Sequence, residues 1–306
     1  MTVWTSKISN IDILSAARKE KSLDLSDLQL QQLSADISAG TYKFGAGRRF
    51  FKSKSDGTER PLVSLAPTDM LVMRAMLDVI QPELNNNLSP FCYSRAGAGT
   101  AQAVATLHTD LLNFKPAVVF VGDFSDYYGM IDRDVLSAPL MKHFGSDQLL
   151  CEMLLNILHI NVVDNSGNDA RRPSGIEQGL PVSPLLSNLY LGAVFDAWVQ
   201  DQGVLAWGRY GDDFYVFPRT SVEVFEKELK KHLDSVSLTL KQSKMQVSHG
   251  FSAEVVEALD PSQRNDIDAV NWLKTSFVPH KMASGNYNVV VEKVGEGRDD
   301  EDSKDE

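Results

Sequence analysis

Cysteine is scarce in this sequence of 306 residues. Its two cysteines, Cys92 and Cys151, form no CxxC pair, so neither a disulfide framework nor a cysteine-based zinc site is indicated. Long apolar runs are lacking as well, because no stretch approaches the roughly 18 apolar residues of a membrane span. The first residues show no hydrophobic core of a signal peptide. These absences predict a soluble, cytoplasmic protein with no membrane partner.

An excess of positive charge is also missing. The net charge is −11 at pH 7, whereas proteins that bind nucleic acid over a broad surface are usually basic. The charges are unevenly placed: residues 296–306 hold seven acids and two bases, which is typical of a disordered tail. Residues 43–60 hold six bases and two acids. We therefore expect any nucleic acid to be held locally, with a solvated surface loop as the alternative for residues 43–60.

Most of the sequence is typical of a folded protein, since 43% of its residues are hydrophobic. Residues 5–40 look helical, with Gly40 as the stop. Pro82 is expected to end an amphipathic helix over residues 67–80, and Thr100 to cap the start of another. Further helices are predicted at three places: residues 133–144, 147–160 and 184–200.

Three carboxylates follow or interrupt apolar runs. Asp123 comes directly after residues 117–122, which are typical of a buried strand. Asp212 and Asp213 lie between two short runs that predict a β-hairpin, with Gly211 supplying the tight turn. Adjacent carboxylates repel each other, so the pair favours a hard divalent cation with oxygen ligands. A plain hairpin tip is the alternative, because Asp is common in turns.

Three segments in this order resemble the palm of reverse transcriptases, most closely the bacterial group that includes group II intron, retron and defence-associated enzymes. The segments are Asp123 with Phe124-Ser125-Asp126-Tyr127-Tyr128, Gln178-Gly179 with the Ser-Pro-Leu-Leu-Ser-Asn of residues 183–188, and Tyr210-Gly211-Asp212-Asp213. The resemblance implies an α+β fold with the fingers and palm of a right-hand polymerase, an antiparallel palm sheet backed by helices, and a thumb that is reduced or absent. The implied division is a helical segment at 1–40, fingers at 41–115, the palm at 116–280, and a short strand with an acidic disordered tail at 281–306.

The implied activity is that of an RNA-directed DNA polymerase, a nucleotidyltransferase that adds deoxynucleotides by a two-metal mechanism. Such sites hold two divalent ions about 3.5–4 Å apart. The resemblance assigns two Mg²⁺ ions, with Mn²⁺ as an alternative, to Asp123, Asp212, Asp213 and the carbonyl of Phe124. Lys244 is implied as the general acid that protonates the leaving pyrophosphate, so the catalytic set comprises the three acids and this lysine.

Six further residues are implied as substrate contacts. Lys52, Lys54 and Arg60 belong to a basic hairpin that turns at Asp56-Gly57, and the fingers of the family fold such bases over the incoming triphosphate. The remaining three are Arg95 at template or nucleotide, Gln178 at the sugar and template side, and Tyr128 as an aromatic that excludes a ribose 2′-hydroxyl. An ordinary core aromatic is the alternative for Tyr128.

The partners implied are an RNA template, a DNA product and deoxynucleoside triphosphates. Because the residues after His280 are too few for a helical thumb, a dedicated noncoding RNA, a partner protein or self-association is expected to help retain the duplex. Antiphage defence or a retroelement is the expected setting. Two alternatives stay open: a template-independent or protein-primed DNA polymerase on the same palm, and a non-catalytic palm-like scaffold subunit.

Overall fold

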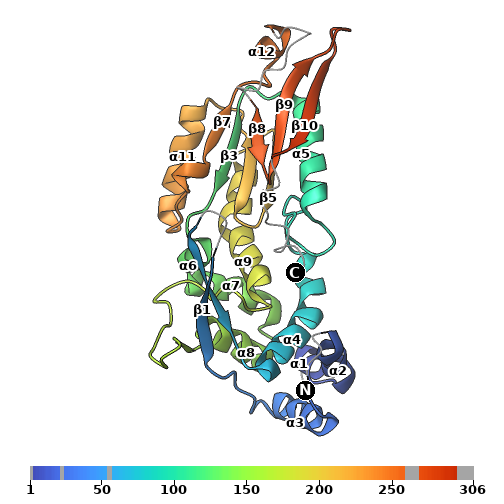
Figure 1. The fold of residues 1–306 in the computed structure, drawn as a ribbon, viewed down its shortest axis with the longest axis vertical. Helices are drawn as coiled ribbons and strands as arrows, with labels where there is room; N and C mark the ends of the chain where they lie inside the picture. The colour runs from blue at the N-terminus through green and yellow to red at the C-terminus, as the bar shows by residue number, and fades with distance from the viewer. Residues whose placement is uncertain (1–2, 21–23, 54–56, 259–268, 295–306) are drawn as a thin grey trace. The chain divides into compact units, whose positions relative to one another are not determined.

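The computed structural model describes residues 3–20, 24–53, 57–258 and 269–294. The chain forms two compact units, coloured along the sequence in Figure 1. Unit 1 comprises Met1–Leu88 and Tyr128–Tyr190, and unit 2 comprises Ser89–Tyr127 and Leu191–Glu306. Among the helices that the structure describes, none has the length and apolar character that crossing a membrane requires.

Unit 1 is mostly helical, as expected for its N-terminal part. Its helices are α1 (Val3–Ile8), α2 (Ile11–Glu20), α3 (Asp27–Ala39), α4 (Pro67–Asn85), α7 (Arg133–Phe144) and α8 (Gln148–Leu158). The short helices α6 (Tyr127–Met130) and α9 (Ser183–Leu191) stand where the chain passes from one unit to the other. A small sheet has the order β2 (Glu59–Ser64), β1 (Gly47–Ser53), β4 (Val162–Val163). The predicted basic hairpin is therefore present, while its turn at residues 54–56 lies outside the described residues.

Three helix boundaries differ from the sequence prediction. Helix α4 does not stop before Pro82 but runs to Asn85, because Pro82 falls in its last turn and the fully buried Leu84 anchors that turn. Helix α5 (Thr100–Phe114) begins at Thr100 itself, with Gly99 in the capping position. The predicted helix over residues 184–200 is interrupted, since a π-helical turn, η1 (Gly192–Asp196), separates α9 from α10 (Ala197–Asp201).

Unit 2 contains two sheets and the remaining elements. The larger sheet is antiparallel and has the order β5 (Ala206–Tyr210), β6 (Asp213–Phe217), β3 (Val119–Asp123), β7 (Gln246–Ser248). The smaller one has the order β10 (Tyr287–Lys293), β9 (Thr275–Lys281), β8 (Val270–Trp272). Besides α5, η1 and α10, the described part of unit 2 contains α11 (Val222–Ser235), the 3₁₀ turn η2 (Gln242–Lys244) and α12 (Ala253–Ala258). This arrangement confirms the predicted α+β fold with an antiparallel sheet backed by helices.

Strand β3 is buried on both faces, which explains why its sequence is an uninterrupted apolar run. On one face, Val119 and Val121 join the core that includes α5 and the smaller sheet. On the other face, which α11 covers (Figure 1), the ring of Phe120 lies 5.5 Å from that of Phe225 on α11. Gly122 is needed here, because a Cβ atom would lie 2.6 Å from the ring of Phe214. A strand packed so tightly fixes the position of the residue at its end, Asp123.

Candidate metal centre

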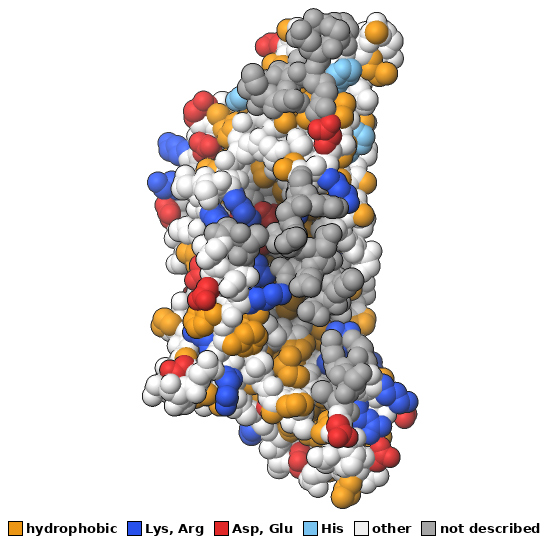
Figure 2. Space-filling view, viewed as in Figure 1, with side chains coloured by type: hydrophobic (Ala, Val, Ile, Leu, Met, Phe, Trp, Pro, Cys, Tyr) orange, Lys and Arg blue, Asp and Glu red, His pale blue; other side chains and the backbone are white. Residues whose placement is uncertain are grey.

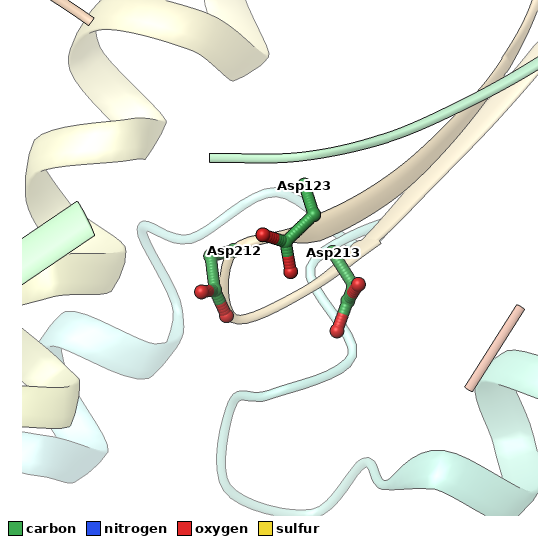
Figure 3. Close-up of side chains that lie close together, drawn as sticks. All are labelled: Asp123, Asp212 and Asp213. Carbon is green, nitrogen blue, oxygen red and sulfur yellow. The ribbon is translucent and has the colours of Figure 1, made fainter. Parts of the chain in front are cut away.

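The register of the larger sheet brings Asp123, Asp212 and Asp213 together. Asp123 at the end of β3 pairs directly with Asp213 at the start of β6. Asp212 lies in the two-residue turn after β5, where Gly211 adopts the left-handed conformation with φ of 60°. Each of the three acids offers a carboxylate oxygen, and these oxygens lie within 4.8 Å of one another. Figure 3 shows the three carboxylates side by side, one from β3 and two from the hairpin.

The acid cluster, meaning Asp123, Asp212 and Asp213, concentrates negative charge in a partly desolvated place. Asp123 is buried, whereas the other two are half-buried. Burial raises the pKa of Asp213 to about 7, and the nearby Asp123 and Asp212 add to this rise while Lys244 opposes it. Like charges that lie directly opposite on neighbouring strands destabilise a sheet. The cluster is therefore electrostatically costly in the absence of a further cation.

Lys244, at the end of η2, supplies one positive charge to the acid cluster. Its ammonium nitrogen lies 2.5 Å from Oδ2 of Asp123 and 3.5 Å from Oδ1 of Asp213. The chain segment that carries Lys244 is held at the end of β3, because the amide of Lys241 donates to the carbonyl of Asp123 at 2.8 Å. Burial lowers the pKa of Lys244, but its hydrogen bond to Asp123 and its attraction to the three acids outweigh that effect, so the pKa is raised. Lys244 is therefore positively charged at neutral pH.

The donor set of the acid cluster fits a hard divalent cation. All three side chains offer carboxylate oxygens, which Mg²⁺ and Mn²⁺ accept as ligands, and no sulfur or imidazole ligand accompanies them in the described cluster. Phe124, predicted as a fourth ligand, follows Asp123 directly, and its ring is buried against Phe195 and Phe214. Any metal contact of Phe124 would have to come from its backbone carbonyl, and this role stays a prediction.

The predicted substrate contacts are distributed over both units. In unit 1, Lys52 on β1 pairs in register with Arg60 on β2, and the carbonyl of Gln178 accepts a hydrogen bond from the amide of Val63 at 2.8 Å. Tyr128 on α6 is half-buried. Lys54 lies outside the described residues. Their roles remain predictions.

Arg95 is the one predicted substrate contact in unit 2, in the segment before α5. It is half-buried. Within the described part of the chain, its Nε atom is buried and has no hydrogen-bond partner. Its contact with template or nucleotide remains a prediction.

Two ion pairs lie beside the predicted residues and were not predicted from the sequence. In unit 2, Arg209 on β5 binds Asp196 of η1 through two hydrogen bonds of 2.8 Å each. In unit 1, Arg49 on β1 binds both carboxylate oxygens of Glu177, the residue before Gln178, at 2.8 and 2.7 Å. For Arg209, the available signal is a charged residue inside an apolar strand pattern, the Ala-Trp-Gly-Arg-Tyr of β5. Such a signal marks a buried charge but does not identify its partner.

Comparisons with known proteins agree with this geometry. Residues 52–262 match the family model described as "Reverse transcriptase (RNA-dependent DNA polymerase)". The chain is 25% identical to protein YkfC of Escherichia coli (strain K12) over 261 residues, which cover 72% of this chain and 68% of YkfC. It is 29% identical to an uncharacterized 91 kDa protein in the cob intron of Schizosaccharomyces pombe (strain 972 / ATCC 24843), covering 56% of this chain but 20% of that protein.

A solved structure shares the fold. Telomerase from Candida albicans, in complex with a fragment of telomeric RNA, superposes with a TM-score of 0.57 at 13% sequence identity. The match covers 83% of this chain and 46% of the telomerase chain. The present chain thus spans about two thirds of YkfC and less than half of the telomerase chain.

Proposed function

Since the chain belongs to the reverse transcriptase (RNA-dependent DNA polymerase) family, we propose that it copies an RNA template into DNA at the acid cluster by a two-metal mechanism. Membership confirms the predicted class of enzyme, a nucleotidyltransferase of the RNA-directed DNA polymerase type. The observation that carries the mechanistic proposal is the meeting of the three carboxylates within 4.8 Å, inside the part of the chain that matches the family.

In this proposal the three acids hold the cations and the hairpin fixes their spacing. When bound, two Mg²⁺ ions would supply Lewis-acid chemistry for nucleotidyl transfer, with Mn²⁺ as a substitute. Asp123 and Asp212 serve as the principal ligands, while Asp213, whose raised pKa disfavours its ionised form, serves as a weaker or outer one. The carbonyl of Phe124 is proposed as a further ligand.

Lys244 is proposed as the group that donates a proton to the leaving pyrophosphate. The raised pKa keeps its ammonium charged, which is the form that a general acid requires. With 47% of its side chain exposed, Lys244 retains freedom to turn from Asp123 towards a phosphate oxygen.

The bases of unit 1 are proposed to bind the triphosphate of the incoming nucleotide. Lys52 and Arg60 lie directly opposite each other on β1 and β2, so two cationic side chains are available together for the oxygens of a triphosphate. Lys54 is assigned to the same task from the sequence alone. Arg95 and Gln178 are proposed to contact the nucleotide or template, and Tyr128 to exclude the ribose 2′-hydroxyl.

The proposed partners are an RNA template, a DNA product and deoxynucleoside triphosphates, with a dedicated RNA, a partner protein or a second copy helping to retain the duplex. On the face seen in Figure 2, the basic and acidic side chains of the described residues are interspersed, in keeping with a local grip. The name of the Schizosaccharomyces pombe relative points to an intron and thus favours a retroelement. Antiphage defence is the other proposed setting, and the cytoplasm the proposed location.

The proposal is tested by primer extension on RNA with purified protein, deoxynucleotides and Mg²⁺. We expect template-dependent extension by the wild type and by a control, Asp201→Asn, in which an exposed acid of α10 is neutralised. Asp123→Ala should abolish extension, because a metal ligand is lost. Extension without any template would favour the template-independent alternative. A folded wild type that extends no primer would instead support the scaffold alternative.

The same assay with ribonucleotides tests the gate assigned to Tyr128. The wild type should reject ribonucleotides, and Tyr128→Val should admit them, because the shorter side chain leaves room for the 2′-hydroxyl. A wild type that incorporates both kinds of nucleotide equally well contradicts the assignment.

A further inference from the structure

Arg209 is a charged residue that is completely buried in unit 2. Its side chain is 0% exposed, although β5 lies next to the strand that begins with Asp213. Nε and Nη2 donate to the two carboxylate oxygens of Asp196, which is itself 3% exposed. Burying two charges is costly unless their geometry is excellent, and this bidentate pair meets that requirement. The third guanidinium nitrogen, Nη1, is not used in this pair.

The third nitrogen connects the pair to the turn that carries the acids. Nη1 of Arg209 donates to the carbonyl of Gly211 at 3.1 Å. Gly211 directly precedes Asp212, and its left-handed φ of 60° sets the direction of the chain there. The backbone of Arg209 is also fixed, because its amide donates to Phe91 at 2.9 Å and its carbonyl accepts from Tyr93 at 2.7 Å. The guanidinium therefore holds the carbonyl of Gly211, while hydrogen bonds fix the backbone of Arg209 itself.

The π-helical turn η1 places Asp196 in reach of Arg209. A π-helical turn inserts an extra residue into a helix and is frequent at functional sites. Here it is stabilised from α11: Nε2 of His232 makes a 2.5 Å hydrogen bond with the carbonyl of Val194, and the ring of His232 stacks on Trp198 with centroids 4.8 Å apart. The irregular helix, the ion pair and the acid-bearing turn are thus linked by consecutive contacts.

We propose that Arg209, held by Asp196, is a positioning residue that fixes the turn of Asp212 and Asp213 for metal binding. The inference rests on the proposed function, since it assigns a role relative to the acid cluster. Neither residue reaches a metal or substrate itself. Arg209 acts through the carbonyl of Gly211, and only a planar guanidinium can bind both oxygens of Asp196 and that carbonyl together. Supporting groups of this kind orient metal ligands.

The test compares Arg209→Lys, which keeps the charge but loses the three-way geometry, with a matched control in the same hairpin. Arg219→Lys is that control, because Arg219 is exposed and donates to the carbonyl of Gly203 at the other end of β5 and β6. Asp196→Glu, which keeps both charges and shifts the carboxylate, is the second variant. Each protein is titrated with Mn²⁺, followed by the electron paramagnetic resonance signal of the free ion, and is then assayed for kcat and KM in primer extension.

We expect Arg209→Lys and Asp196→Glu to weaken Mn²⁺ binding and lower kcat by roughly 10- to 100-fold, with little change in the KM for nucleotide, and Arg219→Lys to do neither. Folded variants with wild-type Mn²⁺ affinity and kcat would overturn the proposal. Failure of both variants to fold while Arg219→Lys folds would also overturn it, in favour of a purely structural pair. If the wild type binds Mn²⁺ and Asp123→Ala binds it equally well, the metal site itself is misassigned and the proposed function fails first.

Discussion

Unit 2 contains two groups of charged side chains that differ in how their charges are balanced. Both groups have members in the hairpin of β5 and β6. In the pair of Arg209 and Asp196, one cation meets one carboxylate, both are buried, and both carboxylate oxygens accept hydrogen bonds. In the acid cluster, three carboxylates lie within 4.8 Å of one another, and Lys244 forms ion pairs with two of them, Asp123 and Asp213. The first group is complete as it stands, whereas the second gains from a cation.

The two groups also differ in their exposure to solvent. Arg209 and Asp196 are inaccessible to ions, while Asp213 and Lys244 keep 31% and 47% of their side chains exposed. A structural ion pair excludes water because its geometry already satisfies every charge, and a binding site keeps access because it must exchange ligands. The comparison predicts that a substitution in the acid cluster lowers activity without lowering stability, whereas a substitution in the buried pair lowers stability as well.

The largest expected effect is on catalysis. Asp212→Asn should reduce the rate of primer extension at least about a thousandfold, which corresponds to about 4 kcal/mol or more of transition-state stabilisation. The thermal midpoint of unfolding should not fall, because the change removes like-charge repulsion within the acid cluster. Single-turnover extension and a thermal melt, with Asp201→Asn as control, check both expectations. A variant that extends primers within tenfold of the wild-type rate would remove Asp212 from the site.

A smaller effect, on stability, is expected at the buried pair. Arg209→Met leaves Asp196 buried without its partner, and we expect it to lower the free energy of unfolding by about 3 kcal/mol. The double variant Arg209→Met with Asp196→Leu should recover most of that loss, because no charge then remains buried. Urea unfolding measures both. If the double variant is no more stable than the single one, uncompensated charge is not the reason for the loss.

The smallest expected effect is on the dependence of folding stability on pH. The pKa of Asp213 in the folded protein is about 7, above its ordinary value of 3.8, so the folded state binds the proton more tightly than the unfolded state. The stability contributed by this group is therefore full below about pH 4 and is lost as pH rises towards 7. Because the side chain is 31% exposed, the change should be on the order of 1 kcal/mol.

Thermal melts between pH 4 and pH 8 measure this slope. Asp213→Asn should flatten it, and Mg²⁺ should stabilise the wild type more at pH 8 than at pH 5. Identical slopes for the two proteins would show that Asp213 does not titrate in this range.

Local patterns in the sequence predict the elements that carry the acid cluster. An apolar run ending in Asp123 and a Gly-Asp-Asp turn between two short strands can be recognised because strand patterns and turn chemistry are local properties of the chain. The resemblance carried by those motifs also anticipated the family that the comparisons confirm. The predicted end of α4 before Pro82 is wrong, because proline's tendency to end a helix is a local property. The burial of Leu84, which extends the helix to Asn85, depends on the fold.

Which buried charges form pairs depends on the three-dimensional fold. Asp196 and Arg209 are separated by 13 positions, and Arg49 and Glu177 by 128. No local pattern links such partners, because their approach depends on strand register and on an extra residue in η1 that shifts the phase of the helix. A charged residue inside an apolar strand pattern indicates a buried charge, and the three-dimensional fold determines which group neutralises it.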